Sequence, residues 1–416
     1  MSQLKFWTWL SALDSVSARK RAHLLSHFGT VEDIYYATEA DYKAVPGIDG
    51  RDRRELLEKS FVRAETVLEI CEKKQIRVIT IQDAEYPDRL KNIDAPPLVL
   101  YTKGRFPLFD EEVAVAVVGS RKHTAYGRLV AERISYELAV GGALVVSGMA
   151  RGIDSCANRG ALNAGKPTVA VLGCGADVVY PAENRELYEE ISVRGCIVTE
   201  YTPGTRPFGG NFPVRNRIIS GLSLGTLIVE APRMSGALIT ANCALEQGRD
   251  VFAVPGNIDI AVNEGGNELI KEGAKLVTSA SDILVEYVHL FPHKLTLPPE
   301  KSRYERASED RPPDLMKVAQ SPSGYARKSA KPAPPPEEAP KEKITEEMIK
   351  GFTEPERKII VSIIQEPRHI DEITELCGIS PADCLSALTM LEIEGAVRQT
   401  GAKYFAIDEA YFTSTP

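Results

Sequence analysis

The sequence predicts an α/β protein whose mostly parallel sheet carries helices on both faces, with a helical module before it and a winged-helix domain after it. Two observations predict the sheet. Between residues 113 and 258, six short runs rich in β-branched residues each end in Gly, Ser, Pro or a charged residue. Helix-length segments separate most neighbouring runs, and apolar strands that alternate with helices are typical of a parallel sheet covered on both faces.

The rest of the chain divides by composition. Residues 1–75 are predicted to be helical, and their turn "VPGIDG" resembles the hairpin of helix-hairpin-helix modules, although a plain turn between helices fits as well. The α/β domain is predicted over 76–292. A flexible linker is predicted over 293–343, because residues 298–343 hold ten of the 27 prolines and no Phe, Trp or Ile. Three helical stretches and a short ribbon over 344–416 predict the winged-helix domain.

Composition excludes several classes of protein. The 416 residues are 43% hydrophobic and 26% charged, as in an ordinary globular protein. No apolar run approaches the roughly 18 residues that a membrane helix needs, and the N-terminus does not resemble a signal peptide, so we expect a cytoplasmic protein without a membrane partner. The seven cysteines are scattered without a CxxC pair, which indicates a reducing compartment and neither disulfides nor a metal site.

Charge is distributed unevenly. The net charge is −8, but residues 344–416 contain six Lys or Arg and thirteen Asp or Glu, a net of −7, which leaves the rest near −1. A nearly neutral domain can still concentrate a few arginines in one groove. The overall acidity therefore does not exclude a nucleic-acid partner.

Polar and Gly-rich segments follow the predicted strands. In parallel α/β sheets, ligands bind beyond the carboxyl ends of the strands. Small residues there let the backbone approach an anion, and the next helix offers its N-terminal N–H groups. Five such segments are expected to meet at one edge of the sheet: "GSRKHTAYG" (119–127), "SGMARGID" (147–154), "GCGADVVYPAEN" (173–184), "NFPVRNRIISGLS" (211–223) and "EAPRMSGALITA" (230–241).

Known phosphate-binding and catalytic patterns do not fit these segments. The dinucleotide fingerprint GxGxxG is absent, and "GALNAGKP" has Pro167 where a P-loop needs Ser or Thr to hold magnesium. Glu200 and Glu230 end strands, but no nucleophile or histidine accompanies them. We therefore expect no cofactor, no metal and no catalytic residue.

Arginine, lysine and phenylalanine among the Gly-rich turns predict a groove for single-stranded nucleic acid. Guanidinium groups bind phosphates in bidentate fashion, and aromatic rings accept stacked bases. Arg215 and Arg217 are expected to bind successive phosphates, with Asn216 at a base edge or bracing the loop. Two alternatives stay open: either arginine could instead pair with an acid such as Glu200, and Phe212 could be a hydrophobic staple.

The predicted DNA-binding residues come from all five segments. They are Gly119, Ser120, Arg121, Lys122, Ser147, Gly148, Arg151, Gly152, Gly173, Gly175, Asn184, Phe212, Arg215, Asn216, Arg217, Ser235 and Gly236.

The motifs "VVGSR", "VVSGMARGIDSCA", "AVLGCGADVVYPAEN", "RNRIISGLS", "SGALITA" and "GRDVFAVPGN", in this order, resemble the DNA-processing protein A family, also called Smf. The resemblance implies an extended Rossmann-like fold that binds single-stranded DNA without hydrolysing nucleotide. It implies a protein that protects incoming DNA during natural transformation and loads the RecA recombinase onto it, as a homodimer through the Rossmann-like domain. Carried over by position, the DNA groove would include Gly119, Ser120, Arg121, Phe212, Arg215, Asn216 and Arg217.

The chain departs from the family pattern in two places. "DSVSAR" (14–19) replaces the usual Pro-Gly turn of the first hairpin, so the N-terminal module could be structural. The presumptive recognition helix "PADCLSALTMLEIEG" has no Lys or Arg, and phosphate would repel its acidic residues. We therefore expect the winged helix to contact protein or to shield the DNA groove.

One enzyme hypothesis remains as an alternative. Nucleotide phosphoribohydrolases use a similar sheet with a PGG-type loop and an Arg–Glu pair. This chain offers a partial match in "PGN" (255–257), with Glu230 and Arg233.

Overall fold

The computed structural model describes residues 3–297, 351–364, 368–401, 404–408 and 411. The chain divides into two compact units, Met1–Asp310 and Arg311–Pro416. Most of the predicted linker lies outside the described residues. Among the helices that are described, none has both the length and the apolar character needed to cross a membrane.

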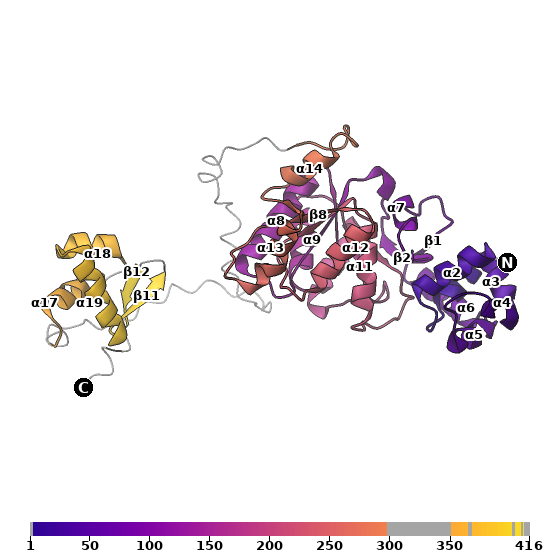
Figure 1. The fold of residues 1–416 in the computed structure, drawn as a ribbon, viewed down its shortest axis with the longest axis horizontal. Helices are drawn as coiled ribbons and strands as arrows, with labels where there is room; N and C mark the ends of the chain where they lie inside the picture. The colour runs from indigo at the N-terminus through magenta and orange to yellow at the C-terminus, as the bar shows by residue number, and fades with distance from the viewer. Residues whose placement is uncertain (1–2, 298–350, 365–367, 402–403, 409–410, 412–416) are drawn as a thin grey trace, which may run out of the picture. The chain divides into compact units, whose positions relative to one another are not determined.

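The first unit is built on a sheet that has nine strands in the described part of the chain, in the order β1-β2-β6-β5-β4-β3-β7-β8-β9. Figure 1 labels β1, β2 and β8 of this sheet among the helices of the unit. All neighbours from β6 to β9 pair in parallel, whereas β1 and β2 join one edge as antiparallel strands. The mostly parallel sheet is therefore confirmed. The strands are β1 Arg77–Thr80, β2 Val99–Gly104, β3 Ala114–Val118, β4 Leu144–Ser147, β5 Thr168–Val171, β6 Cys196–Thr199, β7 Gly225–Ile228, β8 Asp250–Ala253 and β9 Lys275–Leu276.

Helices cover both faces of this sheet, as predicted. Side chains alternate along β3: Val115 and Val117 pack in one core with α8, α9 and α14, whereas Ala116 and Val118 belong to the core that contains α10, α11 and α12. Apolar residues at consecutive positions of one strand are therefore all buried. The helices of this region are α7 Asp88–Lys91, α8 Ala125–Val140, α9 Ile153–Asn163, α10 Arg185–Arg194, α11 Asn211–Gly221, α12 Gly236–Glu246, α13 Glu264–Lys271 and α14 Ser281–Tyr287, with short 3-10 turns at Phe109–Glu111, Ala182–Asn184 and Ala261–Asn263.

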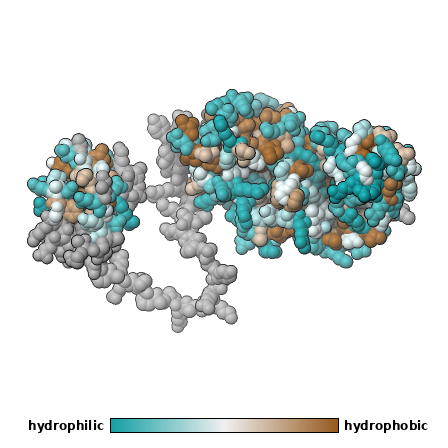
Figure 2. Space-filling view, turned by 60° about the horizontal axis from the view of Figure 1, so that its bottom comes forward, coloured by the Kyte–Doolittle hydropathy of each residue, from teal (hydrophilic) through white to brown (hydrophobic). Residues whose placement is uncertain are grey.

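The N-terminal module consists of short helices that share a core with the edge of the sheet. Trp7 and Trp9 are buried in it, and the Ser11 hydroxyl lies 2.7 Å from the Tyr101 hydroxyl on β2. The surface of the module visible in Figure 2 is mainly hydrophilic. Its helices are α1 Leu4–Ser11, α2 Ala18–Phe28, α3 Val31–Tyr36, α4 Glu39–Lys43, α5 Gly50–Leu57 and α6 Val62–Lys73.

In the turn between α4 and α5, a side-chain carboxylate occupies the N-terminus of α5. The Asp49 carboxylate accepts hydrogen bonds from the backbone N–H groups of Arg51 and Asp52. Lys20 pairs with both Asp49 and Asp52, at 3.0 and 2.6 Å. Because a side-chain carboxylate occupies this helix N-terminus, the structure favours a plain turn between helices over a phosphate-binding hairpin.

The second unit has the helices and ribbon expected of a winged helix. Its core contains Ile359, Ile373 and Leu388, one from each helix, together with Phe405. The described elements are α17 Glu354–Ile363, β10 Arg368–His369, α18 Ile370–Cys377, α19 Pro381–Ile393, β11 Val397–Gly401 and β12 Tyr404–Ile407, and the strands pair in the order β10-β12-β11. The winged-helix prediction is confirmed.

Candidate nucleic-acid interface

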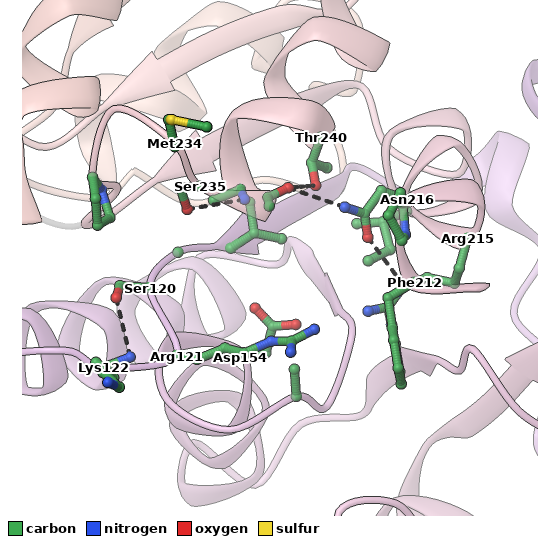
Figure 3. A pocket seen from close by; sticks show the side chains of 18 of the residues that line it. Ser120, Arg121, Lys122, Asp154, Phe212, Arg215, Asn216, Met234, Ser235 and Thr240 are labelled. Atoms are coloured by element: carbon green, nitrogen blue, oxygen red, sulfur yellow. Dashed lines mark hydrogen bonds between the residues drawn. The ribbon is translucent and has the colours of Figure 1, made fainter. Parts of the chain in front are cut away.

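A cavity of about 820 Å³ lies where strands β3 and β7 end, between the turn after β3 and the first turns of α11 and α12 (Figure 3). It combines cations, small residues and aromatic rings. The predicted residues that line it are Gly119, Ser120, Arg121, Lys122, Phe212, Arg215, Asn216, Ser235 and Gly236. The other two segments also reach the cavity, through Asp154 and Tyr180, so the structure brings all five predicted segments into one cavity.

The turn after β3 is packed tightly against the rest of the sheet. The Ser120 N–H donates to the Glu230 carbonyl at 2.6 Å, and the Lys122 N–H donates to the Ser120 hydroxyl at 3.1 Å. A Cβ on Gly119 would lie 2.7 Å from the Ile153 side chain, so glycine is required there. This packing leaves Arg121 and Lys122 exposed at the cavity.

A buried carboxylate already lies at the N-terminus of α8. Glu230 is 1% exposed and accepts hydrogen bonds from the Thr124 N–H, at 2.9 Å, and from its hydroxyl. The sequence predicts that the N–H groups of this helix face a bound anion, but Glu230 would repel one there. The cations of the turn, rather than the helix end, are therefore available to a phosphate.

Glu230 also bears on the enzyme hypothesis. Its carboxylate contacts Thr124, whereas the Arg233 guanidinium lies 3.8 Å from Glu264. Glu230 and Arg233 each have another partner, so this structure does not join them as a catalytic Arg–Glu pair.

Arg215 lines the cavity, and its guanidinium is held by backbone carbonyls. It is only 3% exposed, and its Nη1 donates to the Gly148 carbonyl at 2.9 Å and to the Val171 carbonyl. Asp154, also buried, is the acid whose charge most favours the charged guanidinium, although the two groups do not form a salt bridge. Burial raises the pKa of Asp154 and lowers the pKa of Arg215, and in each case the charge of the partner opposes the shift.

Gly148 makes this arrangement possible. A Cβ there would lie 2.5 Å from Asp154 Oδ2 and would also meet the Arg215 guanidinium. Gly148 thus supports the cavity without lining it.

Arg217 does not reach the cavity, contrary to the prediction. Its guanidinium binds both oxygens of Glu200, at 2.8 and 2.7 Å, and donates from Nε to the Ala95 carbonyl at 3.1 Å. Both side chains of the ion pair are largely buried. Residues two apart on a helix point to different sides, so Arg215 and Arg217 cannot bind successive phosphates in one groove. The alternative of an ion pair with Glu200 is correct for Arg217.

Replacing Arg217 with Lys should lower the free energy of unfolding by about 1–2 kcal/mol, because a single ammonium group cannot replace the bidentate fork. Affinity for oligothymidylate should stay unchanged. Urea unfolding and fluorescence anisotropy measure the two effects, and Arg233→Lys, at an exposed and looser pair, should change stability by no more than about 0.5 kcal/mol. If Arg217→Lys instead lost DNA affinity at unchanged stability, Arg217 would be a DNA-binding residue after all.

Three other predicted side chains have structural partners. The Ser147 hydroxyl is buried and donates to the Val117 carbonyl at 2.7 Å. Asn184 is buried and donates to the Met149 carbonyl at 2.9 Å and to the Ser155 hydroxyl at 2.8 Å. Arg151 forms a bidentate, exposed ion pair with Glu183 at 2.6 and 2.8 Å. None of the three lines the cavity, because their polar groups bind the loops instead.

The three remaining predicted glycines permit close packing. Gly152 has a φ of +84°, and its Cβ would meet the Ser120 carbonyl. A Cβ on Gly173 would lie 2.9 Å from the Phe212 ring, and one on Gly175 would lie 2.9 Å from the Gly204 nitrogen. They too lie outside the cavity lining, and their role in the structure is to permit this close packing.

Aromatic rings form one wall of the cavity. The Arg121 guanidinium carbon lies 5.3 Å from the centre of the Phe212 ring, and the Tyr180 ring centre lies 5.4 Å from it with a 30° tilt. Phe212 therefore belongs to the site and is not simply a staple into the core. The sequence pattern does not single out Tyr180, although it lies in the third polar segment.

The side chains of the cavity do not form a metal site. Among the residues that the structure describes, no three His, Cys, Asp or Glu side chains are grouped so that they could hold a metal ion. The cavity is lined by guanidinium and ammonium groups, an amide, hydroxyls, aromatic rings and the carboxylate of Asp154.

Comparisons with known proteins agree with this architecture. A family model described as DNA recombination-mediator protein A matches residues 77–288, and a model of the DprA winged helix domain matches residues 329–403. Protein Smf of Synechocystis is 32% identical over 411 residues, which cover 97% of this chain and 98% of the relative. DNA processing protein DprA of Bacillus subtilis is 39% identical over 230 residues, which cover 55% of this chain and 77% of the relative.

A solved structure supports the same assignment. The X-ray structure of DNA processing protein A from Streptococcus pneumoniae has a TM-score of 0.60 at 34% identity, and the match covers 69% of this chain and 98% of that one. Fold and comparisons together define a DNA-processing protein with a Rossmann-like sheet and a winged helix. The chain belongs to the DprA/Smf family.

Proposed function

We propose that this protein is a single-stranded DNA-binding recombination mediator. In this proposal it protects incoming DNA and loads RecA onto it during natural transformation, in the cytoplasm, as a homodimer and without catalysis. The observation that carries the proposal is the cavity itself, where the exposed cations Arg121 and Lys122 line one site together with aromatic rings and the Arg121 guanidinium lies over the Phe212 ring. Cations for phosphates and rings for bases are the two components of a sequence-tolerant site for single strands. The family assignment supports the recombination role.

The proposal is tested by measuring the affinities of the protein for oligothymidylate and for a duplex of equal length. Fluorescence anisotropy measures both affinities at a series of salt concentrations. We expect tighter binding of the single strand and a slope of log K against log salt of about −0.7 for each phosphate contacted. Equal affinity for single strand and duplex, or a slope near zero, would contradict it. RecA filament assembly on single strands, with and without this protein, tests the mediator step separately.

A further inference from the structure

The two aromatic residues near Arg121, Phe212 and Tyr180, differ in how much of their side chain is exposed. Tyr180 is 37% exposed and lines the cavity. Phe212 is half-buried, since its ring contacts Tyr180 and the Arg121 guanidinium and lies against Gly173. The ring that the sequence pattern selects is therefore the one with less surface left for a ligand.

The two rings also differ in whether a face remains open to a ligand. A ring that accepts a nucleobase needs an open face, because stacking requires parallel contact over most of the base. Phe212 already uses part of its surface to pack against the cation of Arg121, which holds the guanidinium at the cavity. Tyr180 is supported by Phe212 and faces the cavity, so its ring remains available.

We propose that Tyr180 is the residue on which a nucleobase of the bound strand stacks, with Phe212 as its support and Arg121 bound to the adjoining phosphate. This inference rests on the proposed single-strand binding, and it names the residue that contacts a base of the bound strand. It predicts that part of the affinity for DNA depends on the presence of bases, and that this part is lost when the Tyr180 ring is removed.

The test compares two ligands of equal length and charge, an oligothymidylate and an abasic deoxyribose-phosphate strand. The full-length protein should bind the oligothymidylate roughly tenfold more tightly than the abasic strand, given the usual strength of base–aromatic stacking. Tyr180→Ala should remove most of that difference and leave affinity for the abasic strand unchanged. Tyr180→Phe should behave like the parent, because it keeps the ring.

Tyr136→Ala is the matched control. Tyr136 is 46% exposed on α8 but does not line the cavity, so losing its ring should change neither affinity. Tyr180→Trp adds a direct readout: Trp7 and Trp9 are buried, so quenching of a new exposed indole by oligothymidylate, and not by the abasic strand, would report stacking.

The outcomes separate the inference from the proposed function. If Tyr180→Ala keeps the full preference for oligothymidylate, Tyr180 is not the stacking residue, although the protein still binds single strands. If the parent binds neither strand, the proposed function itself fails. Equal loss for both strands in Tyr180→Ala, with Tyr180→Phe normal, would overturn the inference in favour of a structural role.

Discussion

Replacing Arg215 with Met should lower the free energy of unfolding of the first unit by about 3 kcal/mol, because it leaves two buried carbonyls without their donor and a buried carboxylate without a nearby positive charge. The substitution leaves Asp154 buried without its counter-charge and removes the donor to the Gly148 and Val171 carbonyls. Urea unfolding at pH about 8 measures this loss of stability. The fluorescence of Trp7 and Trp9 monitors the transition, because both residues belong to the first unit.

The pH dependence of the loss identifies its cause. Without Arg215, the pKa of Asp154 should rise further above its ordinary value, so between the ordinary and the raised pKa the folded state binds more protons than the unfolded state. The stability of the variant should then fall as pH rises through this range. Relative to the parent, the deficit should be largest near pH 8 and should shrink as Asp154 becomes protonated at lower pH.

Asp154→Asn provides the control in a double-mutant cycle. The amide keeps an acceptor for the Gly148 and Ala150 backbone N–H groups but carries no charge. Arg215→Met should therefore cost less in the Asp154→Asn background than in the parent. Equal costs in both backgrounds, with no change with pH, would show that Arg215 acts through its carbonyl partners alone.

The central sheet could be predicted from sequence because its strands are short, apolar and followed by small residues. Strands β1, β2 and β9 could not. The strands β1 and β2 are antiparallel and are separated by a segment whose helix, α7, has four residues, and β9 is only two residues long. None of the three fits the alternation of apolar strand and helix on which the prediction depends.

At the site, sequence reasoning located the segments but not the partners of individual side chains. The spacing of Arg215 and Arg217 carried a usable signal, since residues two apart on a helix diverge. No comparable signal indicated that Asn184 would bind the Met149 carbonyl, because that hydrogen bond joins residues 35 apart in the chain. Long-range hydrogen bonds of this kind depend on the folded loops and are not encoded in local pattern.

Replacing Arg121 with Ala should weaken binding of oligothymidylate roughly 10- to 100-fold, as expected for losing hydrogen bonds between a guanidinium and a phosphate. The loss should be similar for all sequences, because phosphate contacts do not read bases. The slope of log K against log salt should become shallower by about 0.7 for each phosphate that the variant no longer binds. Since Arg121 is exposed, stability should change by no more than about 0.5 kcal/mol.

Arg159→Ala is the matched control for this prediction, because Arg159 is an exposed arginine on α9 that does not line the cavity. It changes the net charge by the same amount, so it should reproduce only the long-range part of the electrostatic loss, which salt screens. If Arg121→Ala and Arg159→Ala weaken binding equally, the effect is one of net charge and the cavity is not the DNA site. A loss confined to Arg121→Ala, with the shallower slope, requires a phosphate bound at the turn after β3, where Glu230 already occupies the helix end and only the side-chain cations remain to hold it.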